Sequence, residues 1–358
     1  MLNKIFPEGI PLSPLERIKA EGKPVLLYGM GNGAEKMLAV CEKYNVTVDG
    51  VFASDGFSSG KIFCGYKVLT VSDLHSVYPS GFTALVCFGC KASDMRMYIG
   101  KVKRAGGTVF MPHLPLFGGE LMTAGYFQSR SSEIEKAYSL LSDDRSRRMF
   151  VGICRYFLTW DPEELFSCEC NSYTYPDFFI NHDVRTAIDG GAYRGDTVLS
   201  ISNAFPEVNK IIAFEPDSAN FAKLKKVRVD GVKIECIEKG LYKKDAVLSF
   251  AALKNRGSHF AEGGIDVPVT SIDIATGEKI DLIKLDVEGC EAEAIDGSIN
   301  TLLRYHPALY ISLYHKTDDF FELILKINGI SDKYEFSLLR EDVCPAWDII
   351  LLARKRPE

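Results

Sequence analysis

No apolar run in this 358-residue sequence approaches the roughly 20 residues that a membrane-spanning helix needs. Residues 1–10 likewise lack an apolar core as long as that of a secretory signal peptide. Positive charge is not in excess, because 42 Lys and Arg stand against 48 Asp and Glu, a formal net charge of −6. A broad surface for nucleic acid or anionic lipid needs clustered Lys and Arg. We therefore expect a cytoplasmic protein with no transmembrane segment and no nucleic-acid partner.

The ten cysteines show no spacing that would complete a zinc site. Cys87 and Cys90 have C-x-x-C spacing, but no second C-x-x-C pair accompanies them. Cys168 and Cys170 have no evident ligand partners either. Most of the cysteines lie in apolar segments, which is typical of reduced, packed thiols in a cytosolic protein. We expect neither disulfides nor a redox centre.

The length and the order of apolar segments predict two α/β domains, since a domain usually holds roughly 100–200 residues. In residues 1–117, short apolar strands alternate with helices, which predicts a small Rossmann-like parallel sheet. Residues 118–182 are expected to form a helical linker, and residues 183–358 a second α/β domain. In the first domain we expect strands at 24–28, 46–52, 84–88 and 108–111, helices at 34–44, 71–78 and 93–103, and a loop at 58–69.

A glycine turn, Gly29-Met-Gly-Asn-Gly33, follows the first of these strands. Asp49 or Asp55 then stands about 20 residues later, where an acidic residue meets a ribose hydroxyl in a dinucleotide site. The spacing is G-x-G-x-G-A, so alanine stands near the position of a third glycine. The turn is compatible with a dinucleotide, with another ligand, or with simple packing of the helix on the strand.

The linker contains helical spacing of apolar residues at 131–157 and a further helix that begins at Asp161. The aromatic stretch at residues 173–179 precedes the second domain. It is expected either to pack against that domain or to cover its ligand as a lid.

In the second domain, five predicted strands end on polar residues, and these residues are Asp189, Glu215, Glu238, Asp286 and His315. Ligands of open parallel sheets bind outside the carboxyl ends of the strands, so five such ends predict one functional rim. We expect the strands at 186–189, 210–215, 232–238, 281–286 and 308–314, with added strands at 246–252 and 266–271 around a loop at 257–264. We expect helices at 197–205, 218–227, 291–300 and 318–327, and a terminal antiparallel pair at 334–339 and 347–353.

The first of these strand ends continues as Asp189-Gly-Gly-Ala-Tyr-Arg-Gly-Asp-Thr197. Glycines permit backbone angles and close ligand approach that a Cβ would block, and a helix start presents unpaired N–H groups. This corner is suited to a nucleotide cofactor, either a nicotinamide dinucleotide or a methyl donor.

Four motifs together resemble those of FkbM-type methyltransferases, which depend on S-adenosylmethionine. They are Asp189-Gly-Gly-Ala-x-x-Gly-Asp-Thr197, Phe214-Glu-Pro-Asp217, Ser271-Ile-Asp273 and Ile283-Lys-Leu-Asp-Val-Glu-Gly-Cys-Glu291. The resemblance covers residues 175 to the C-terminus and implies a class I methyltransferase sheet of seven strands. It implies that the turn from Asp189 to Ala192 holds the methionine part of the cofactor, that Glu215 accepts hydrogen bonds from both ribose hydroxyls, and that residues near Glu238 border the adenine. The implied cofactor-binding residues are Asp189, Gly190, Gly191, Ala192, Tyr193, Gly195, Asp196, Thr197, Glu215, Pro216, Glu238, Gly240 and Asp286.

Asp286 would also face the centre of methyl transfer, where a hydroxyl acceptor benefits from a base. His315 is the first candidate for this base and His259 the second, while Asp286 or Glu288 could also serve. We name His315 and Asp286 as the catalytic residues. Asp286, Glu288 and Glu291 can alternatively be interpreted as a metal cluster, although we assign no metal ligand because Asp286 is expected to face the cofactor.

Some bacterial FkbM-type proteins carry an N-terminal Rossmann-like domain with a glycine turn and a segment like Gly65-Tyr-Lys-Val68, and related domains accompany sugar-modifying enzymes. The resemblance therefore implies O-methylation of a sugar, polysaccharide or glycolipid precursor, with a glycan or another small hydroxyl compound as substrate. The alternatives are an NAD-dependent oxidoreductase that uses the Gly29 turn, and a non-catalytic scaffold that binds the cofactor. Whether identical chains form a homo-oligomer is left open.

Overall fold

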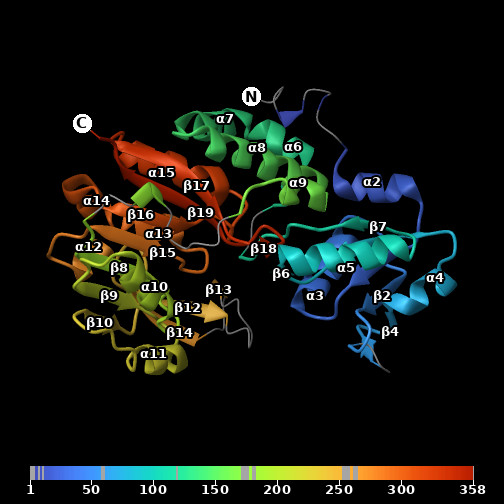
Figure 1. Cartoon of the computed structure of the whole chain (residues 1–358), viewed down its shortest axis with the longest axis horizontal. Helices are drawn as coiled ribbons and strands as arrows, with labels where there is room; N and C mark the ends of the chain where they lie inside the picture. The colour runs from blue at the N-terminus through green and yellow to red at the C-terminus, as the bar shows by residue number, and fades with distance from the viewer. Residues whose placement is uncertain are drawn as a thin grey trace.

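The computed structural model describes residues 5–6, 9, 12–57, 61–117, 120–170, 177–179, 183–251, 259–260 and 265–357. Two α/β units lie side by side in Figure 1, the N-terminal one in blue to cyan and the C-terminal one in yellow to red. The green helices α6 to α9 lie along the top of this view. No helix of the described residues is both long enough and apolar enough to cross a membrane.

The N-terminal unit is built on a six-stranded sheet with the order β3-β4-β2-β1-β5-β7, in which every pairing except that of β3 with β4 is parallel. This confirms the small Rossmann-like sheet. The strands are β1 (Val25–Tyr28), β2 (Gly50–Ala53), β3 (Ile62–Phe63), β4 (Tyr66–Thr70), β5 (Phe82–Val86) and β7 (Gly107–Phe110). The helices are α2 (Pro14–Glu21), α3 (Asn32–Lys43), the 3-10 turn Val71–Asp73, α4 (Leu74–Val77) and α5 (Ala92–Arg104).

The prediction of a loop at 58–69 was wrong for its second part. Residues 58–60 lie outside the described residues, but β3 and β4 follow them, and β4 pairs in parallel with β2, with Val68 opposite Val51. Val68 is the one buried residue of β4, since Lys67 is exposed and Tyr66, Leu69 and Thr70 are partly exposed, so the strand lacks the buried apolar run by which the other strands were recognised.

Between the two sheets, the described residues contain the four α-helices α6 to α9. They are α6 (Ala124–Ser129), α7 (Ser131–Leu140), α8 (Asp144–Thr159) and α9 (Pro162–Phe166). Helix α8 is fixed to the C-terminal unit, because Phe150 stacks on Phe320 with ring centroids 4.6 Å apart. Of the aromatic stretch at 173–179, only the 3-10 turn Asp177–Phe179 is described, so the proposed lid lies mostly outside the described residues.

The C-terminal unit is a seven-stranded sheet with the order β10-β9-β8-β15-β16-β19-β17, and β19 runs antiparallel between β16 and β17. This confirms the predicted class of sheet and the terminal antiparallel pair. The strands are β8 (Thr186–Gly190), β9 (Lys210–Phe214), β10 (Lys233–Ile237), β15 (Leu282–Leu285), β16 (Ala308–Ser312), β17 (Tyr334–Arg340) and β19 (Ile349–Lys355). A four-stranded side sheet contains β11 (Gly240–Leu241), β12 (Ala246–Ala251), β13 (His259–Phe260) and β14 (Ile265–Thr270).

The helices of this unit are α10 (Asp196–Ala204), α11 (Ser218–Leu224), α12 (Ile272–Ala275), α13 (Glu291–Asp296), α14 (Ile299–Tyr305) and α15 (Asp319–Ile330). The single helix predicted at 291–300 is in fact two helices that meet at Gly297. A Cβ at Gly297 would overlap the carbonyl oxygen of Tyr242, so the chain turns where this close approach occurs. Of the loop predicted at 257–264, only residues 259–260 are described.

The two units touch at the carboxyl ends of the C-terminal strands. Strand β6 (Cys90–Lys91) pairs with β18 (Val343–Cys344), which joins the N-terminal unit to the segment between β17 and β19. The N–H groups of Leu116 and Phe117 both donate to the carbonyl oxygen of His315 at 3.1 Å. The segment that leaves the N-terminal sheet therefore reaches the predicted rim.

Candidate active site

The glycine turn after β8 stands on a buried ion pair. Asp189 is fully buried, and its Oδ1 atom lies 3.2 Å from Nζ of Lys284. The ammonium of Lys284 also donates to the carbonyl oxygens of Gly190 and Gly191, at 3.1 and 2.9 Å. Thr197 donates its hydroxyl proton to the other oxygen of Asp189. Asp189 thus holds the turn from beneath, and its carboxylate is already occupied by these partners.

The pairing of Lys284 with a buried carboxylate was not predicted, although the sequence indicates that this lysine needs a partner. A lysine inside the buried strand β15 needs a charged partner, because unpaired buried charges are costly. Burial on its own would lower the pKa of Lys284, but the carboxylates of Asp189 and Asp286 raise it above the ordinary value. The lysine is therefore a fixed positive charge under the rim.

Gly191 lets the two central loops of the rim meet. Its φ is +74°, and a Cβ there would overlap the carbonyl oxygen of Asp286. Ala192, next to it, is fully buried, and the turn then leads through Tyr193 and Gly195 into α10, which begins at Asp196. The residues predicted from the turn motif thus form one continuous structure.

Glu215 joins this turn to the end of β9. One carboxylate oxygen accepts the N–H of Tyr193 at 2.8 Å, and the other accepts the N–H of Asp217 at 2.9 Å. Burial raises the pKa of Glu215 to about 7, although the two N–H donors act in the opposite direction. Each oxygen keeps a further acceptor position, since an ionised carboxylate offers about four lone-pair sites.

The structure does not bring Glu238 into this group. Its side chain is exposed after β10, and no contact of it with the other predicted residues is present among the described residues. Gly240 lies in β11, where a Cβ would stand 3.2 Å from Val269 and 3.9 Å from Pro216. Pro216 and Gly240 are therefore neighbours, while the place of Glu238 beside a ligand stays a prediction.

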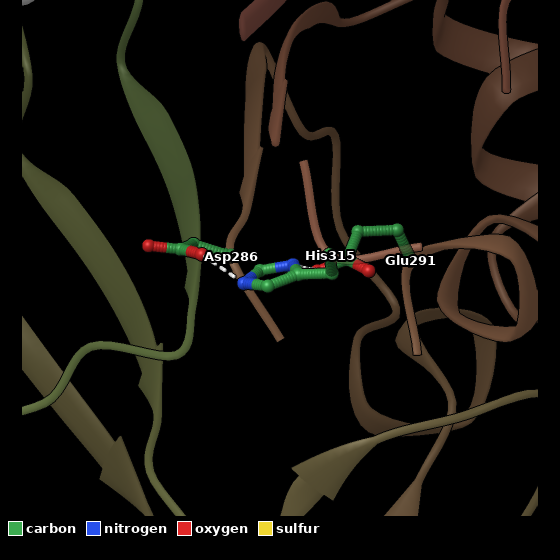
Figure 2. Close-up of side chains that lie close together, drawn as sticks. All are labelled: Asp286, Glu291 and His315. Carbon is green, nitrogen blue, oxygen red and sulfur yellow. Dashed lines mark hydrogen bonds and ion pairs between the residues drawn. The ribbon is translucent and has the colours of Figure 1, made fainter. Parts of the chain in front are cut away.

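Asp286, His315 and Glu291 form the second half of the site, and Figure 2 shows the imidazole between the two carboxylates. Nδ1 of His315 lies 2.8 Å from Oε1 of Glu291, and Nε2 lies 3.4 Å from Oδ1 of Asp286. His315 and Glu291 are buried, whereas the side chain of Asp286 is 36% exposed. Asp286 also accepts the hydroxyl proton of Tyr314 at 3.1 Å.

The charges around His315 favour its protonated form. Burial opposes the charge, but Glu291, Asp286 and Glu288 together raise the pKa of His315 to about 10. Burial likewise opposes the ionised form of Asp286, yet Lys284 and His315 lower its pKa below the ordinary value. A protonated imidazole cannot accept a proton, so His315 in this arrangement is not ready to act as the free base predicted from the sequence.

Three further acidic groups complete the rim, and sequence patterns had pointed to only one of them, Glu288. Desolvation beside His315 raises the pKa of Glu288 to about 7, although half of its side chain is exposed, and burial raises the pKa of Asp348 to about 6. Oε2 of Glu288 lies 3.7 Å from Nε2 of His315. Asp319 is buried beside Glu291, and burial raises its pKa to about 7. Asp348 and Asp319 come from loops and helices far along the chain, so no local motif marks them.

Among the described residues, Asp286, Glu291 and His315 are the group whose ligand atoms lie close enough, within 4.8 Å of one another, to suit a metal ion. His259, the second candidate base, is described only as part of β13, and the position of its side chain lies outside the description.

The glycine turn of the N-terminal unit has a structural explanation. A Cβ at Gly33 would overlap the carbonyl oxygen of Cys87, so the glycine allows α3 to approach the end of β5. Asp49 accepts the N–H of Val25 at 2.8 Å, which places it at the start of β1, the opposite end of the strand from the turn. The prediction that Asp49 meets a ribose is therefore wrong. Asp55, the alternative residue, accepts the N–H of Ser72 at 3.3 Å.

Comparison with known proteins agrees with this geometry. Residues 189–338 match the family described as the methyltransferase FkbM domain. No curated protein matches the sequence. The crystal structure of methyltransferase FkbM from Methylobacillus flagellatus KT is similar over 98% of this chain and 96% of that chain, with a TM-score of 0.74 and 16% identity.

Two other solved structures overlap with about half of the chain. A putative rRNA methylase from Clostridium thermocellum covers 51% of this chain and 93% of its own, with 11% identity and a TM-score of 0.35. A precorrin-6y C5,15-methyltransferase from Geobacter metallireducens GS-15 covers 49% and 82%, with 13% identity and a TM-score of 0.31. Residues 189–338 of this chain are therefore similar to the methyltransferase FkbM domain, and the chain shares the fold of the FkbM structure from Methylobacillus flagellatus KT.

Proposed function

We propose that the chain is an S-adenosylmethionine-dependent O-methyltransferase of the cytoplasm that acts on a hydroxyl of a sugar, polysaccharide or glycolipid precursor. The observation that carries the proposal is Glu215, whose carboxylate stands at the end of β9 and is bound to the backbone of the glycine turn. A carboxylate held in this way is suited to two neighbouring ribose hydroxyls, because each oxygen retains an acceptor position.

The residues present fit such a cofactor. Gly191 brings the turn against the backbone of Asp286, so a ligand on the turn would also border the end of β15. The start of α10 follows at Asp196 with the unpaired N–H groups of a helix start. Asp286 has a lowered pKa and is ionised at neutral pH, which suits the cationic amino group of a methionine moiety.

When bound, the cofactor supplies a methyl carbon to which the acceptor oxygen forms a new bond, while the electron pair of the broken carbon–sulfur bond stays on sulfur. The contribution of the protein is mainly to hold the acceptor close and in line. We place the acceptor hydroxyl beside Asp286 and His315, on the side of the rim where Asp286 and Glu288 are 36% and 50% exposed. The hydroxyl proton passes to solvent water through this partly open side.

Support for a sugar-like acceptor comes from the same exposed groups. Carboxylates accept hydrogen bonds from hydroxyl groups, and two of them on one open rim suit a compound with several neighbouring hydroxyls. The N-terminal unit, which contributes Phe117 to this rim, adds further surface for such a substrate.

Calorimetric titration of the full chain with S-adenosylmethionine, and separately with NAD, tests the proposal. We expect heat from S-adenosylmethionine only, and its loss in Glu215→Ala. Tight binding of NAD without S-adenosylmethionine would instead favour an oxidoreductase. A labelled methyl donor offered with sugar nucleotides and glycan extracts then tests turnover. Cofactor binding with no labelled product from any of these hydroxyl compounds would favour a scaffold.

A further inference from the structure

We propose that Cys90 and Cys344 are a site of reversible thiol oxidation, where a disulfide joins the N-terminal unit to the C-terminal unit. The inference goes beyond the proposed function and does not depend on it, because it concerns the joint between the two units. Both thiols are free in this structure. The C-x-x-C spacing associates Cys90 with Cys87, and no sequence pattern associates it with Cys344, so only the fold brings this pair together.

The first support is the register of the two strands at this joint (Figure 1). Strand β6 pairs antiparallel with β18, and Cys90 stands directly opposite Cys344. Residues directly opposite each other in such a pair have Cα atoms about 4.5 or 5.5 Å apart and side chains on the same face. Cysteines joined by a disulfide usually have Cα atoms about 4.4–6.8 Å apart. The backbone therefore already holds the two cysteines at a separation that a disulfide can span.

The second support is the turn between Cys87 and Cys90, which separates the two cysteines of the C-x-x-C motif. Cys87 is buried in the core of the N-terminal unit, where its Sγ donates to a carbonyl oxygen of β5 at 3.2 Å. Gly89 lies against the other unit instead, because a Cβ at Gly89 would overlap the ring of Trp347. Cys90 therefore leaves the turn on the side of the C-terminal unit, where its register partner is Cys344.

The third support is a buried positive charge, that of Arg340, beside the thiol of Cys344. Arg340 is fully buried, and its Nε has no partner among the residues that the structure describes. Within the same residues its guanidinium donates to Sγ of Cys344 at 3.5 Å, to the carbonyl oxygen of Val343 at 3.2 Å, and to Sγ of Cys170. None of these acceptors is a carboxylate, although a buried charge needs a partner of opposite charge. A cation beside a thiol stabilises the thiolate, so Arg340 favours the charged sulfur that forms during disulfide exchange.

Access to the site is through Cys90, whose side chain is partly exposed, whereas that of Cys344 is fully buried. The thiolate of Cys90 attacks one sulfur of a low-molecular-weight disulfide, and the other sulfur leaves as a small thiolate. Cys344 then gives up its proton and attacks the Cys90 sulfur of this mixed disulfide, and the second small thiolate leaves. The two cysteines together lose two electrons and two protons, which the oxidant takes up as it becomes two thiols.

The ionisation of the two thiols sets the speed of this exchange, because the thiolate is the attacking form. Burial raises the pKa of both Cys90 and Cys344 to about 11. The charged or titratable groups that act on them are Asp94 at Cys90, and Arg340, Cys170, Cys90 and Asp342 at Cys344. Of these groups, only Arg340 lowers a pKa. The bond should therefore form slowly at pH 7, and faster by roughly tenfold for each further unit of pH while the thiols are mostly protonated.

A bond at this place would close a loop of about 250 residues and hold the N-terminal unit against the C-terminal one. The segment from β18 to β19 contains Asp348, one of the acidic groups of the rim, so the bond would also restrain part of the rim. Disulfides in cytosolic proteins are usually transient and redox-sensing, which agrees with a bond that forms and breaks reversibly.

The test is incubation of the reduced, folded full chain with glutathione disulfide at pH 7, 8 and 9, followed by alkylation of free thiols and mass spectrometry of the peptides. We expect one intramolecular disulfide, between Cys90 and Cys344, which forms faster at each higher pH and is removed by dithiothreitol. In Cys344→Ser the reaction should stop at the mixed disulfide on Cys90, and in Cys90→Ser the buried Cys344 should stay unmodified. In urea the preference for this pair should disappear, because the unfolded chain has no fixed register.

Cys64→Ser is the matched control, because Cys64 is an exposed thiol of the N-terminal unit, between β3 and β4. This variant should form the bond between Cys90 and Cys344 at the rate of the parent chain, and its loss in both Cys64→Ser and Cys90→Ser would overturn the proposal. A folded parent chain that forms no disulfide would also overturn it, as would a bond of Cys90 to Cys87, a bond of Cys344 to Cys170, or an equal yield of the proposed bond in urea. Circular dichroism before oxidation establishes that each chain is folded, so that a missing bond is not a result of unfolding.

Discussion

Lys284 and Asp189 form an ion pair directly beneath the glycine turn, with 3.2 Å between Nζ and Oδ1 and with side chains no more than 3% exposed. The two residues are also register partners in the parallel pairing of β15 with β8. The pair therefore connects the strand that ends at the glycine turn to the strand that ends at Asp286.

We expect Lys284→Met to destabilise the protein by about 3–5 kcal/mol, because it leaves Asp189 as an unpaired buried charge. It also removes the donor to the carbonyl oxygens of Gly190 and Gly191. Urea unfolding followed by circular dichroism measures the loss. Lys233→Met is the control, since the Lys233 side chain is 73% exposed and its change should stay within about 0.5 kcal/mol. Equal effects of the two substitutions would show that the buried pair does not stabilise the turn.

The pair also shows how far the sequence leads. The alternation of strands and helices predicted both sheets, and the strand ends predicted Asp189, Glu215, Asp286 and His315 as one rim, because these features repeat locally along the chain. Which partner each side chain takes was not predictable. Lys284 meets Asp189 only because the two strands pair in one particular register.

The same limit applies around His315. Its position after β16 predicted a place on the rim, but its role as a base was predicted from the ordinary pKa of an imidazole. The pKa depends on Glu291, Asp286 and Glu288, which come from another loop and helix and raise it to about 10. Such a shift follows from the three-dimensional arrangement and not from the residue type.

The raised pKa of Glu215 leads us to expect that cofactor affinity depends on pH. Its pKa is raised to about 7 by burial, and the neutral acid offers fewer acceptor positions to ribose hydroxyls than the carboxylate. The affinity for S-adenosylmethionine should therefore increase between pH 6 and pH 8. Calorimetry at pH 6, 7 and 8 measures this change, and Glu215→Gln should bind more weakly and lose the step near pH 7. A step that persists in Glu215→Gln would assign it to another group.

The same raised pKa makes the stability of the chain without cofactor depend on pH in the opposite direction, so that stability decreases as the pH rises. The folded-state pKa of Glu215 lies above the ordinary value of 4.5, so the folded state holds this proton more tightly. The stability that Glu215 adds to the folded state by holding this proton is fully present below pH 4.5. It is lost as the pH rises through about 7. Urea unfolding across this range should show a smaller decrease in Glu215→Gln than in the parent chain.

Gly191→Ala tests the close approach of the two rim loops. An alanine Cβ would overlap the carbonyl oxygen of Asp286, in addition to the cost of about 1–2 kcal/mol for a left-handed alanine. Gly231→Ala is a matched control, since Gly231 has a similar φ of +76° but no atom within 4 Å of its Cβ position. We expect Gly191→Ala to lower the melting temperature more and to abolish cofactor binding, whereas Gly231→Ala should keep it. Similar behaviour of the two variants would mean that the loops need not touch.

Ser146 tests whether the helices between the sheets belong to the C-terminal unit. The N–H of Leu338 in β17 donates to Oγ of Ser146 at 2.8 Å, and this hydroxyl also lies 2.8 Å from that of Ser337. Ser146→Ala would leave the buried N–H of Leu338 without its acceptor, which costs about 1–3 kcal/mol. Helix α8 and β17 should then separate more readily, which hydrogen exchange of both elements would report together with urea unfolding.

Ser202→Ala provides the comparison, because among the described residues Oγ of Ser202 bonds to the carbonyl oxygen of Val198 within the same helix, α10. Loss of that bond leaves no buried polar group without a hydrogen-bond partner. The substitution should therefore change stability by no more than about 0.5 kcal/mol. If Ser146→Ala behaves like Ser202→Ala and leaves exchange in β17 unchanged, α8 is an independent linker. If it speeds exchange in both α8 and β17, the helices form one cooperative unit with the methyltransferase sheet, and the boundary expected at residue 183 lies too late in the chain.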